Sequence, residues 1–541
     1  MTTSPPTTPY YISTPIYYVN DAPHIGHCYT TLLADVLARF HRLAGRDVFF
    51  LTGTDEHAEK VVTSAQDRGL TPIEWADRNA EAFRDAFEMM NFSNDDFLRT
   101  TEPRHKEFVV SSISELQSKG DIELGEYVGW WDPSQEEYVT ENEAREHEFK
   151  SPVTGKELVK RTEQNYFFKL SKYEDRLKAH IEANPSFILP ESRRNEVMGR
   201  IKQGLRDVPI SRAIDEADPA SQWGIRMPGD DGHRVYVWID ALLNYMTAVT
   251  PEDKQKYWPA QVHLIAKDIL WFHAVIWPCM LMAMGRELPK TVYAHSYWIR
   301  EGRKMSKSLG NFLDLPTLRA YTDRYSLDAL RYYLLVQGPL GSTDADFVHG
   351  RFIETYNADL ANGIGNAFSR VTNMIGKYFD GTMPAMGEHT FEGFDWPASA
   401  SAAVDAANEC AGREDIVGLI KAGLGLSNTV DSFVNATEPF KLAKDESKKD
   451  ELASILACCA EALRLAGVLM MPAMPEKMAE LLSRLGQSPP DSSTGSHDLD
   501  AITRWGAIEP GTPISKGDPL FMRADADAPA PEAATAEGTA T

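Results

Sequence analysis

The sequence predicts an α/β protein built on a Rossmann-type parallel sheet with a small β-rich connective insertion, followed by an all-α helical bundle. Three patterns predict this fold class. Residues 10–51 form a strand, a helix and a second strand, and such a βαβ unit starts a parallel sheet. Short alternating apolar runs between residues 120 and 209 predict the insertion. From residue 348 onward, apolar residues recur at helical spacing and predict the bundle.

The first loop of the βαβ unit has the sequence His24-Ile25-Gly26-His27. It follows an apolar strand at residues 10–16 and precedes a helix that Gly45 is expected to end. Free N–H groups and the helix dipole favour an anion at a helix N-terminus, and Gly26 lets a ligand approach the backbone. The loop therefore suits a phosphate. A helix cap with two exposed histidines is the simpler interpretation of these residues alone.

The second strand of the unit ends in Thr52-Gly53-Thr54-Asp55-Glu56-His57. Open α/β sheets bind ligands at the carboxyl ends of their strands, so Asp55 can pair there with a substrate ammonium. A helix N-cap is the alternative role for an aspartate at this position. Later segments are expected to form an amphipathic helix at residues 71–90 and further strands at residues 234–239, 262–265 and 291–299.

The bulk properties fit a globular protein of two to four domains. The chain has 541 residues, of which 43% are hydrophobic and 25% charged, and a formal net charge of −24. Its longest apolar tract, residues 271–284, is too short to cross a bilayer, and its first residues do not resemble a secretory signal. The acidic charge gives no support to a nucleic-acid partner, although a local basic strip can hold RNA on an acidic protein.

The five cysteines show no C-x-x-C spacing and no disulfide framework. This usage fits a reducing cytoplasm and excludes a zinc site built from cysteines.

A second charged loop, Lys304-Met305-Ser306-Lys307-Ser308, lies far along the chain. Lysine is a mobile point charge suited to phosphate, and serine hydroxyls add hydrogen-bond donors. By itself a lysine-rich pentamer is most often a solvated surface loop. Together, however, the two loops resemble the paired HIGH and KMSKS signatures of the class I aminoacyl-tRNA synthetases. The surrounding sequence, from about residue 10 to 485, is most similar to the methionine-specific members of that family.

The resemblance implies an ATP-dependent ligase in which the two loops close on ATP, with Mg²⁺ as part of the substrate complex. The catalytic residues that it implies are His24, His27, Lys304 and Lys307, which would stabilise charge on the transferring phosphoryl group. Ala266 stands where the family commonly has glycine, and Asp268 is expected at the ribose. The implied ATP-binding residues are His24, Gly26, His27, Lys267, Asp268, Lys304, Ser306, Lys307 and Ser308.

The resemblance also implies a methionine site. Asp55 matches the aspartate that holds the α-amino group, and aromatic walls suit a polarizable thioether. His273 and Trp277 share a helical face, and an aromatic pair on an apolar helix is by itself more often part of a core. Tyr18, Trp238 and His273 rank first for the side chain. The full set is Ile16, Tyr18, Asp55, Arg212, Trp238, Ala241, Tyr245, Ile269, His273 and Trp277.

The predicted bundle matches the anticodon-binding domain of the family. Asn366 and Arg370 match residues that read anticodon bases, whereas without the family they would be a solvated helix face. Phe440 stands where the family usually has tryptophan, and it can stack on a base but lacks the indole donor. The tail beyond residue 486 has no room for an additional oligonucleotide-binding domain, so a monomer is expected.

Two features of the insertion bear on metal and specificity. The knuckle of the family often holds zinc through cysteines, but residues 130–160 contain no cysteine and only His147, so we expect packing and no structural zinc. The insertion is also too small for a separate editing domain. This favours methionine over isoleucine, valine or leucine, because one methylene gives only about 1–3 kcal/mol of discrimination.

These patterns divide the chain into six expected segments. They are residues 1–119 (first half of the Rossmann domain), 120–209 (connective insertion with a metal-free knuckle), 210–300 (second half), 301–347 (lysine loop and stem contact), 348–486 (anticodon-binding bundle) and 487–541 (C-terminal extension, largely disordered from 524).

The predicted reaction activates L-methionine with ATP to methionyl-adenylate and pyrophosphate, and then transfers methionine to the 3′-terminal ribose of tRNA(Met). A cytoplasmic enzyme with no membrane partner is expected. The alternatives are another class I amino acid ligase such as a cysteine-specific one, a small nucleotidyltransferase, and a catalytically decayed tRNA-binding paralogue. The cysteine-specific ligase is disfavoured because cysteine ligands for zinc are missing. The small nucleotidyltransferase does not account for the lysine loop together with the helical domain. The decayed paralogue is disfavoured because His24, His27, Asp55 and Lys307 are all present.

Overall fold

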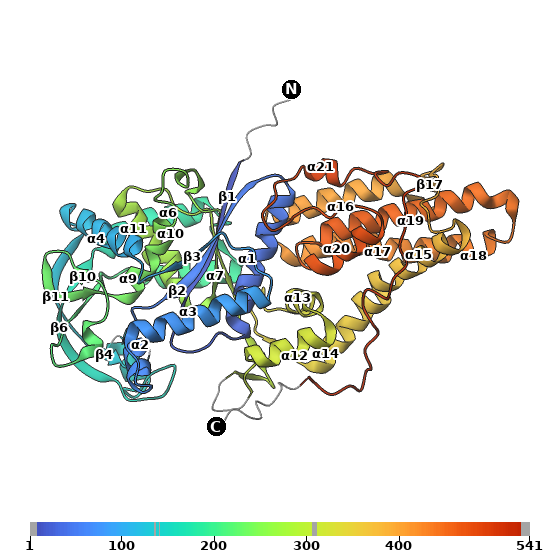
Figure 1. Ribbon diagram of the computed structural model, residues 1–541. Helices are drawn as coiled ribbons and strands as arrows, with labels where there is room; N and C mark the ends of the chain where they lie inside the picture. The colour runs from blue at the N-terminus through green and yellow to red at the C-terminus, as the bar shows by residue number, and fades with distance from the viewer. Residues whose placement is uncertain (1–7, 135–136, 140, 306–310, 532–541) are drawn as a thin grey trace.

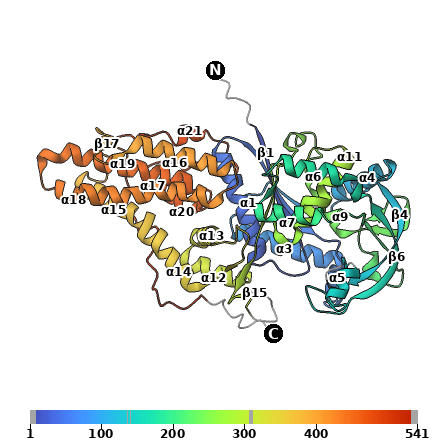
Figure 2. The ribbon, with the colours of Figure 1, turned by 180° about the vertical axis from the view of Figure 1, so that it is seen from behind.

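The computed structural model describes residues 8–134, 137–139, 141–305 and 311–531. Figure 1 shows two lobes, one built around a parallel sheet and the other an elongated bundle of helices. Helix α1 (Ile25–Leu43) lies where the lobes meet. The view from behind shows the same division, with α12 (Leu315–Tyr325), α13 (Leu327–Val336) and α14 (His349–Thr355) below the end of the bundle that is nearest the sheet lobe (Figure 2).

The sheet lobe confirms the Rossmann-type prediction. Its central sheet has six parallel strands, and the strand order reverses between β1 and β12, which is the switch point at which such sheets bind ligands. Its strands are buried on both faces, because helices cover each side. In spatial order they are β3 (Asp96–Arg99), β2 (Asp47–Asp55), β1 (Pro9–Tyr18), β12 (Val262–Ala266), β13 (Thr291–His295) and β7 (Ile188–Leu189).

The helices of this lobe follow the expected local chemistry. Gly45 has a φ of 79° just beyond α1, a backbone conformation that favours glycine, so the helix ends there as predicted. Thr71 and Glu74 form a capping box at the start of α3. The helices are α2 (Glu59–Gln66), α3 (Pro72–Met89), α4 (Pro103–Ser118), α6 (Glu174–Ala183), α7 (Glu191–Ile201), α9 (Val237–Leu242), α10 (Asn244–Thr247) and α11 (Trp277–Met284).

The β-rich character of the insertion is confined to part of the predicted range. Antiparallel strands β4 (Ile122–Asp132), β5 (Glu137–Val139), β6 (Val159–Phe168) and β8 (Val208–Pro209) form one sheet. Between β6 and β8 the chain is instead largely helical, and β7 joins the parallel sheet. The apolar residues of α6, Leu177 and Ile181, are four apart, a helical spacing that the alternating pattern before them obscured.

The knuckle is packed around a small apolar cluster. Val139, Ala144 and Leu158 are buried there, and Trp130 packs against them. Among the described residues, no group of three His, Cys, Asp or Glu side chains is placed to hold a metal ion. The expectation of a knuckle held by packing remains a prediction that this cluster supports.

Two predicted strands differ from those found. The expected strand at residues 234–239 is wrong, because β11 (Asp230–Val235) belongs to a separate antiparallel sheet with β9 (Ser211–Ala213) and β10 (Arg226–Met227), and residues 237–242 form α9. A short apolar run does not distinguish strand from helix. The expected strand at residues 291–299 is split, since β13 ends at His295 and β14 (Trp298–Arg300) pairs with β15 (Arg303–Lys304) and β16 (Ala345–Asp346).

The helical bundle is also confirmed. Helix α16 was not predicted, because its alanine-rich sequence has weak periodicity, yet Asp395 caps it. By length and hydropathy the segment Glu446–Met470 is long enough to cross a membrane, but its apolar window is wholly buried within the protein. The helices are the π-helical segment Tyr356–Ile364, α15 (Gly365–Tyr378), α16 (Trp396–Ala411), α17 (Ile416–Thr437), α18 (Pro439–Leu442), α19 (Lys449–Met470) and α20 (Pro475–Arg484).

The C-terminal extension lies along the bundle. Buried Glu461 of α19 accepts a hydrogen bond from the backbone N–H of Ala507 (3.0 Å). The side chain of Asn357 exchanges two hydrogen bonds with the backbone of Ala524 (2.9 and 3.0 Å). Disorder was expected from residue 524, and over residues 524–531 the structure differs, because backbone groups there find partners that their composition does not reveal.

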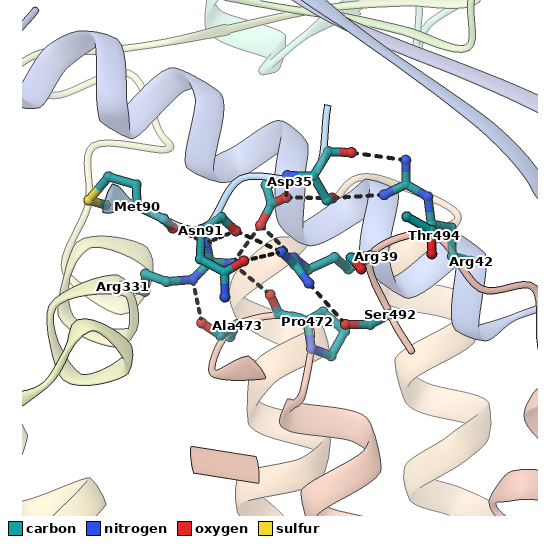
Figure 3. Close-up of polar contacts among 12 residues, drawn as sticks. Asp35, Arg39, Arg42, Met90, Asn91, Arg331, Pro472, Ala473, Ser492 and Thr494 are labelled. Carbon is teal, nitrogen blue, oxygen red and sulfur yellow. Dashed lines mark hydrogen bonds and ion pairs between the residues drawn. The ribbon is translucent and has the colours of Figure 1, made fainter. Parts of the chain in front are cut away.

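A buried charge network joins the two lobes (Figure 3). Asp35 of α1 accepts hydrogen bonds from Arg39 (2.8 Å) and from Arg331 of α13 (2.6 Å). Arg331 also donates to the carbonyl oxygens of Pro472 and Ala473, each at 3.0 Å, between α19 and α20. The helix that begins with the His24 loop is therefore connected to the bundle through Arg331.

Candidate functional site

A cavity of about 340 Å³ opens at the carboxyl ends of β1, β2, β12 and β13, at the switch point of the sheet. Residues from several distant segments meet in its wall. They are Pro15, Ile16, Tyr17, Tyr18, His24, Ile25, Gly26, His27, Tyr29, Thr30, Asp55, Trp238, Ala266, Asp268, Ile269, His295, Ser296, Tyr297, Trp298, Lys304, Met305 and Phe312.

The two histidines of the first loop form the N-terminal cap of α1. The backbone N–H of Gly26 donates to Nδ1 of His24 (3.0 Å), and that of His24 donates to Nδ1 of His27 (3.2 Å). Since each Nδ1 accepts a hydrogen bond, the proton of each neutral ring is on Nε2. The helix-cap interpretation is thus correct, and it is compatible with ligand binding because the cap fixes both rings in the cavity wall.

The surroundings of these rings pack them closely together and keep His27 neutral. Their ring centroids are 3.9 Å apart. Burial, and then the neighbouring His24, lower the pKa of His27 well below its usual value. A Cβ added at Gly26 would lie 2.8 Å from Cε1 of His24, so only glycine leaves that ring in place.

The predicted methionine residues divide into two layers. Ile16, Tyr18, Asp55, Trp238 and Ile269 line the cavity itself. The rings of Tyr18 and Trp238 meet edge to face with centroids 5.7 Å apart, and the Asp55 side chain is buried. This wall therefore combines an aromatic surface with one carboxylate.

The other aromatic candidates lie in a buried layer that does not line the cavity. His273 donates from Nδ1 to the carbonyl of Ile269 (2.9 Å), so its Nε2 accepts from the Tyr245 hydroxyl (2.7 Å). Burial lowers the pKa of His273 to about 4, although the bond to Ile269 opposes this shift. Trp277 donates to His263 (3.3 Å) and Ala241 is likewise buried. These side chains support the wall and do not form its surface.

Two further predicted residues lie outside the cavity wall. The Arg212 guanidinium stacks 3.9 Å from the Tyr236 ring centroid and donates to the carbonyl of Ser211 (2.8 Å). Lys267 forms an ion pair with Asp344 (2.6 Å), whereas its neighbour Asp268 does line the cavity. The structure therefore brings the carboxylate of the Lys267-Asp268 pair to the cavity and directs the ammonium elsewhere.

The lysine loop is described only at its two ends. Lys304 lines the cavity, and Ser306, Lys307 and Ser308 lie outside the described residues. Just after the loop, the carbonyl of Leu313 accepts from the backbone N–H of Ile25 (3.2 Å). Asp314 also pairs with His24 as an isolated bridge. Both ends of the loop are thus held beside the histidine loop.

Sequence reasoning missed the segment His295 to Trp298, which contributes four residues to the cavity wall. The His295 ring donates from Nδ1 to the carbonyl of Ser296 (2.7 Å) and accepts at Nε2 from Thr30 of α1 (2.7 Å). Burial lowers its pKa to about 4, although the bond to Ser296 opposes this. The sequence signal that could have identified this segment is the carboxyl end of β13, because ligands bind at that edge of the sheet. The strand was expected to end at residue 299, four residues beyond its actual end at His295.

The three predicted anticodon residues lie on the bundle, remote in sequence from the cavity. Arg370 of α15 pairs with Asp431 (2.9 Å) and bonds to Asn435 (3.0 Å), both on α17. Asn366 is exposed one helical turn earlier. Phe440 is 45% exposed on the short helix α18, which is unusual for a large apolar side chain and leaves its ring available for stacking.

Comparisons with known proteins agree over nearly the whole chain. The family model described as tRNA synthetases class I (M) matches residues 10–147 and 146–372. A methionine–tRNA ligase of Listeria monocytogenes is 43% identical, covering 96% of this chain and 78% of its own length. A methionine–tRNA ligase of Streptomyces coelicolor is 42% identical, covering 95% of this chain and 96% of its own length.

Solved structures give the same result. A Mycobacterium tuberculosis methionyl-tRNA synthetase in complex with methionyl-adenylate has a TM-score of 0.84 and 36% sequence identity, covering 95% of this chain and 100% of that one. The apo form of the M. tuberculosis enzyme has a TM-score of 0.81 and 33% identity, covering 96% and 99%.

Proposed function

This chain belongs to the tRNA synthetases class I (M) family, and from that premise we propose that it is a methionine–tRNA ligase. It activates L-methionine with ATP and transfers the amino acid to tRNA(Met). The observation that carries the proposal is the full-length similarity to methionine–tRNA ligases, one of which is solved with methionyl-adenylate. The cavity supports it, because imidazoles, a carboxylate and an aromatic wall meet there.

In the first step, a carboxylate oxygen of methionine attacks the α-phosphorus of ATP. The bond from that phosphorus to the bridging oxygen breaks, and pyrophosphate leaves. In the second step, the terminal ribose hydroxyl of the tRNA attacks the carbonyl carbon of methionyl-adenylate, and AMP leaves. The substrates supply both nucleophiles, so the protein has to align the reactants and stabilise developing charge.

The residues of the cavity suit these tasks. In their neutral form His24 and His27 carry the proton on Nε2, so both rings can donate a hydrogen bond to a phosphate oxygen. Asp55 would pair with the α-ammonium, and Tyr18 and Trp238 would contact the thioether. Asp268 would bind the ribose. Lys304 and Lys307, with Gly26, Ser306 and Ser308, would complete the phosphate site around the Mg²⁺–ATP substrate.

The remaining parts of the proposal concern partners and location. Asn366, Arg370 and Phe440 would contact the anticodon, supported by the exposed Phe440 ring. We further propose that the protein is cytoplasmic, on the basis of its cysteine usage. The main alternative is another class I amino acid ligase, since discrimination between amino acids depends on a few side chains in the pocket.

The test is ATP–pyrophosphate exchange with methionine and with other apolar amino acids and cysteine, one at a time. We expect exchange with methionine far above that with the others. Exchange driven equally well by another amino acid would overturn the assignment, and a well-folded protein without any exchange would indicate a tRNA-binding paralogue.

Replacing Lys307 by alanine tests the lysine loop. Adenylate formation should fall by about 10²-fold or more while methionine binding stays nearly intact, as expected for an interaction that is strongest in the transition state. Lys421→Ala, at an exposed position of α17, is the matched control and should change neither. Equal losses of rate and of methionine affinity in Lys307→Ala would contradict this role.

A further inference from the structure

A buried carboxylate lies between two imidazoles next to the cavity. Asp240 of α9 accepts from Nδ1 of His57 (2.6 Å) through one oxygen and from Nε2 of His105 (2.8 Å) through the other. All three residues are at most 3% exposed. On the far side, Nδ1 of His105 bonds to Thr247 of α10 (2.9 Å). None of these four residues lines the cavity.

This cluster connects the two elements that carry the proposed methionine residues. His57 stands two residues after Asp55, at the carboxyl end of β2. Asp240 is two residues after Trp238, on α9. The bond between His57 and Asp240 therefore links the segment that carries the Asp55 carboxylate to the helix that carries the Trp238 indole. His105 ties the same carboxylate to α4.

Other contacts hold each end of this connection. Trp223 donates from Nε1 to the carbonyl of Glu56 (2.6 Å), and its ring lies 5.7 Å from that of His57. The Glu56 side chain pairs with Arg99 (2.7 Å). At the other end, the Trp238 ring stacks on Phe272 with centroids 4.2 Å apart. Each end is thus held by its own local contacts, and the bond between His57 and Asp240 joins the two ends.

The chemistry of the cluster requires a carboxylate. Both imidazoles approach with a ring nitrogen, and a carboxylate has acceptor oxygens for two N–H donors. Asparagine has nearly the same shape but only one acceptor oxygen, so its amide group would face an imidazole N–H. Burial raises the pKa of Asp240, but His57 and His105 outweigh this and hold it below its usual value.

We propose that Asp240 is a positioning residue for methionine, which acts through His57 to hold Asp55 and Trp238 at the spacing that the amino acid requires. The inference rests on the proposed function and deepens it. Asp240 itself contacts no substrate. Its loss should weaken methionine binding selectively, because the ATP side of the cavity is built from the loops that contain His24 and Lys304.

The experiment measures KM for methionine, KM for ATP and kcat in pyrophosphate exchange. In Asp240→Asn we expect KM for methionine to rise by about 10-fold while KM for ATP changes by less than about 2-fold, since a small misplacement of binding groups is enough for such a loss. His57→Leu removes the other partner of the same bond, so it should also raise KM for methionine and leave KM for ATP nearly unchanged. His57→Asn keeps an N–H donor near the position of Nδ1 and should restore most of the affinity.

Glu461→Gln is the control for a purely structural effect. Glu461 is equally buried and pairs with Arg464 (2.7 Å), but it lies in the bundle. This variant should lower the thermal midpoint and leave both KM values unchanged. The double variant Asp240→Asn with His57→Leu should raise KM for methionine no further than Asp240→Asn alone, because that variant already breaks the bond between His57 and Asp240.

Several outcomes would overturn the inference. Equal increases in both KM values, an unchanged KM for methionine in His57→Leu, or additive losses in the double variant would each refute positioning through His57. If Asp240→Asn does not fold, His57→Leu and His57→Asn still decide the question. Failure of the proposed function is distinguishable, because it would appear as absent methionine exchange in the unmodified protein.

Discussion

Replacing Asp35 by asparagine should destabilise the protein strongly, because it leaves buried guanidinium groups without their counter-charge. The Asp35 side chain is fully buried and accepts four hydrogen bonds, from Arg39 (2.8 Å), from Arg331 (2.6 Å) and from the backbone and hydroxyl of Ser93 (2.7 Å each). Removing one partner of a buried ion pair typically costs about 3–5 kcal/mol. The network joins α1 to the bundle, so the loss should loosen the contact between the lobes.

The expected shift follows from the size of the cooperative unit. With an unfolding entropy of about 2.1 cal/mol/K per residue, a chain of this length shifts its Tm by about 1 °C per kcal/mol, so Asp35→Asn should lower the Tm by about 3–5 °C. If only part of the chain unfolds in the transition, the shift will be larger. Differential scanning calorimetry measures it, with exposed Asp85→Asn as the matched control.

The pH dependence gives the sharper test. Burial raises the pKa of Asp35, but Arg39 and Arg331, with Ser93, outweigh this and leave it below its usual value. A lowered carboxylate pKa adds stability above the unfolded value of about 3.9, and this stability is lost as the pH falls through the folded value. The difference in Tm between the unmodified protein and Asp35→Asn should therefore have its full size at pH 7 and become smaller in acid. An unchanged Tm at pH 7 would refute the reasoning.

Two further predictions concern the anticodon and the missed cavity residue. Phe440→Ala should weaken tRNA(Met) binding by about 1–3 kcal/mol, the usual value of one base stack, and leave tRNA-independent pyrophosphate exchange unchanged; unaltered tRNA affinity would contradict it. The pKa of His295 is about 4 in the folded protein and about 6.5 in the unfolded chain. As the pH drops, the unfolded chain therefore takes up this proton first, and the free energy of unfolding falls by about 2–3 kcal/mol between these two pKa values. His295→Gln should remove that part of the acid dependence, and identical pH profiles of thermal stability would contradict the prediction.

The sequence was most informative where local chemistry and chain periodicity act together. The βαβ unit, the position of α1 and its histidine cap, and the start of the helical bundle all follow from apolar spacing and from turn residues such as Gly45. Four residues of the cavity wall belong to segments that resemble those of the class I aminoacyl-tRNA synthetases; they are Ile16, Tyr18, Asp55 and Trp238. Periodicity failed for short runs, as at residues 234–239, because a few apolar residues satisfy both strand and helix.

By itself, then, the sequence determined the class of fold and several of the segments that meet at the cavity, because secondary structure and short motifs depend on neighbours along the chain. Tertiary structure alone decided which side chains reach the cavity surface. Tyr245, His273 and Trp277 lie in the buried layer, whereas His295 lies in the wall. That difference depends on strand register and on the packing of helices distant in sequence, such as the contact of Asp240 with His57, and no local pattern records it.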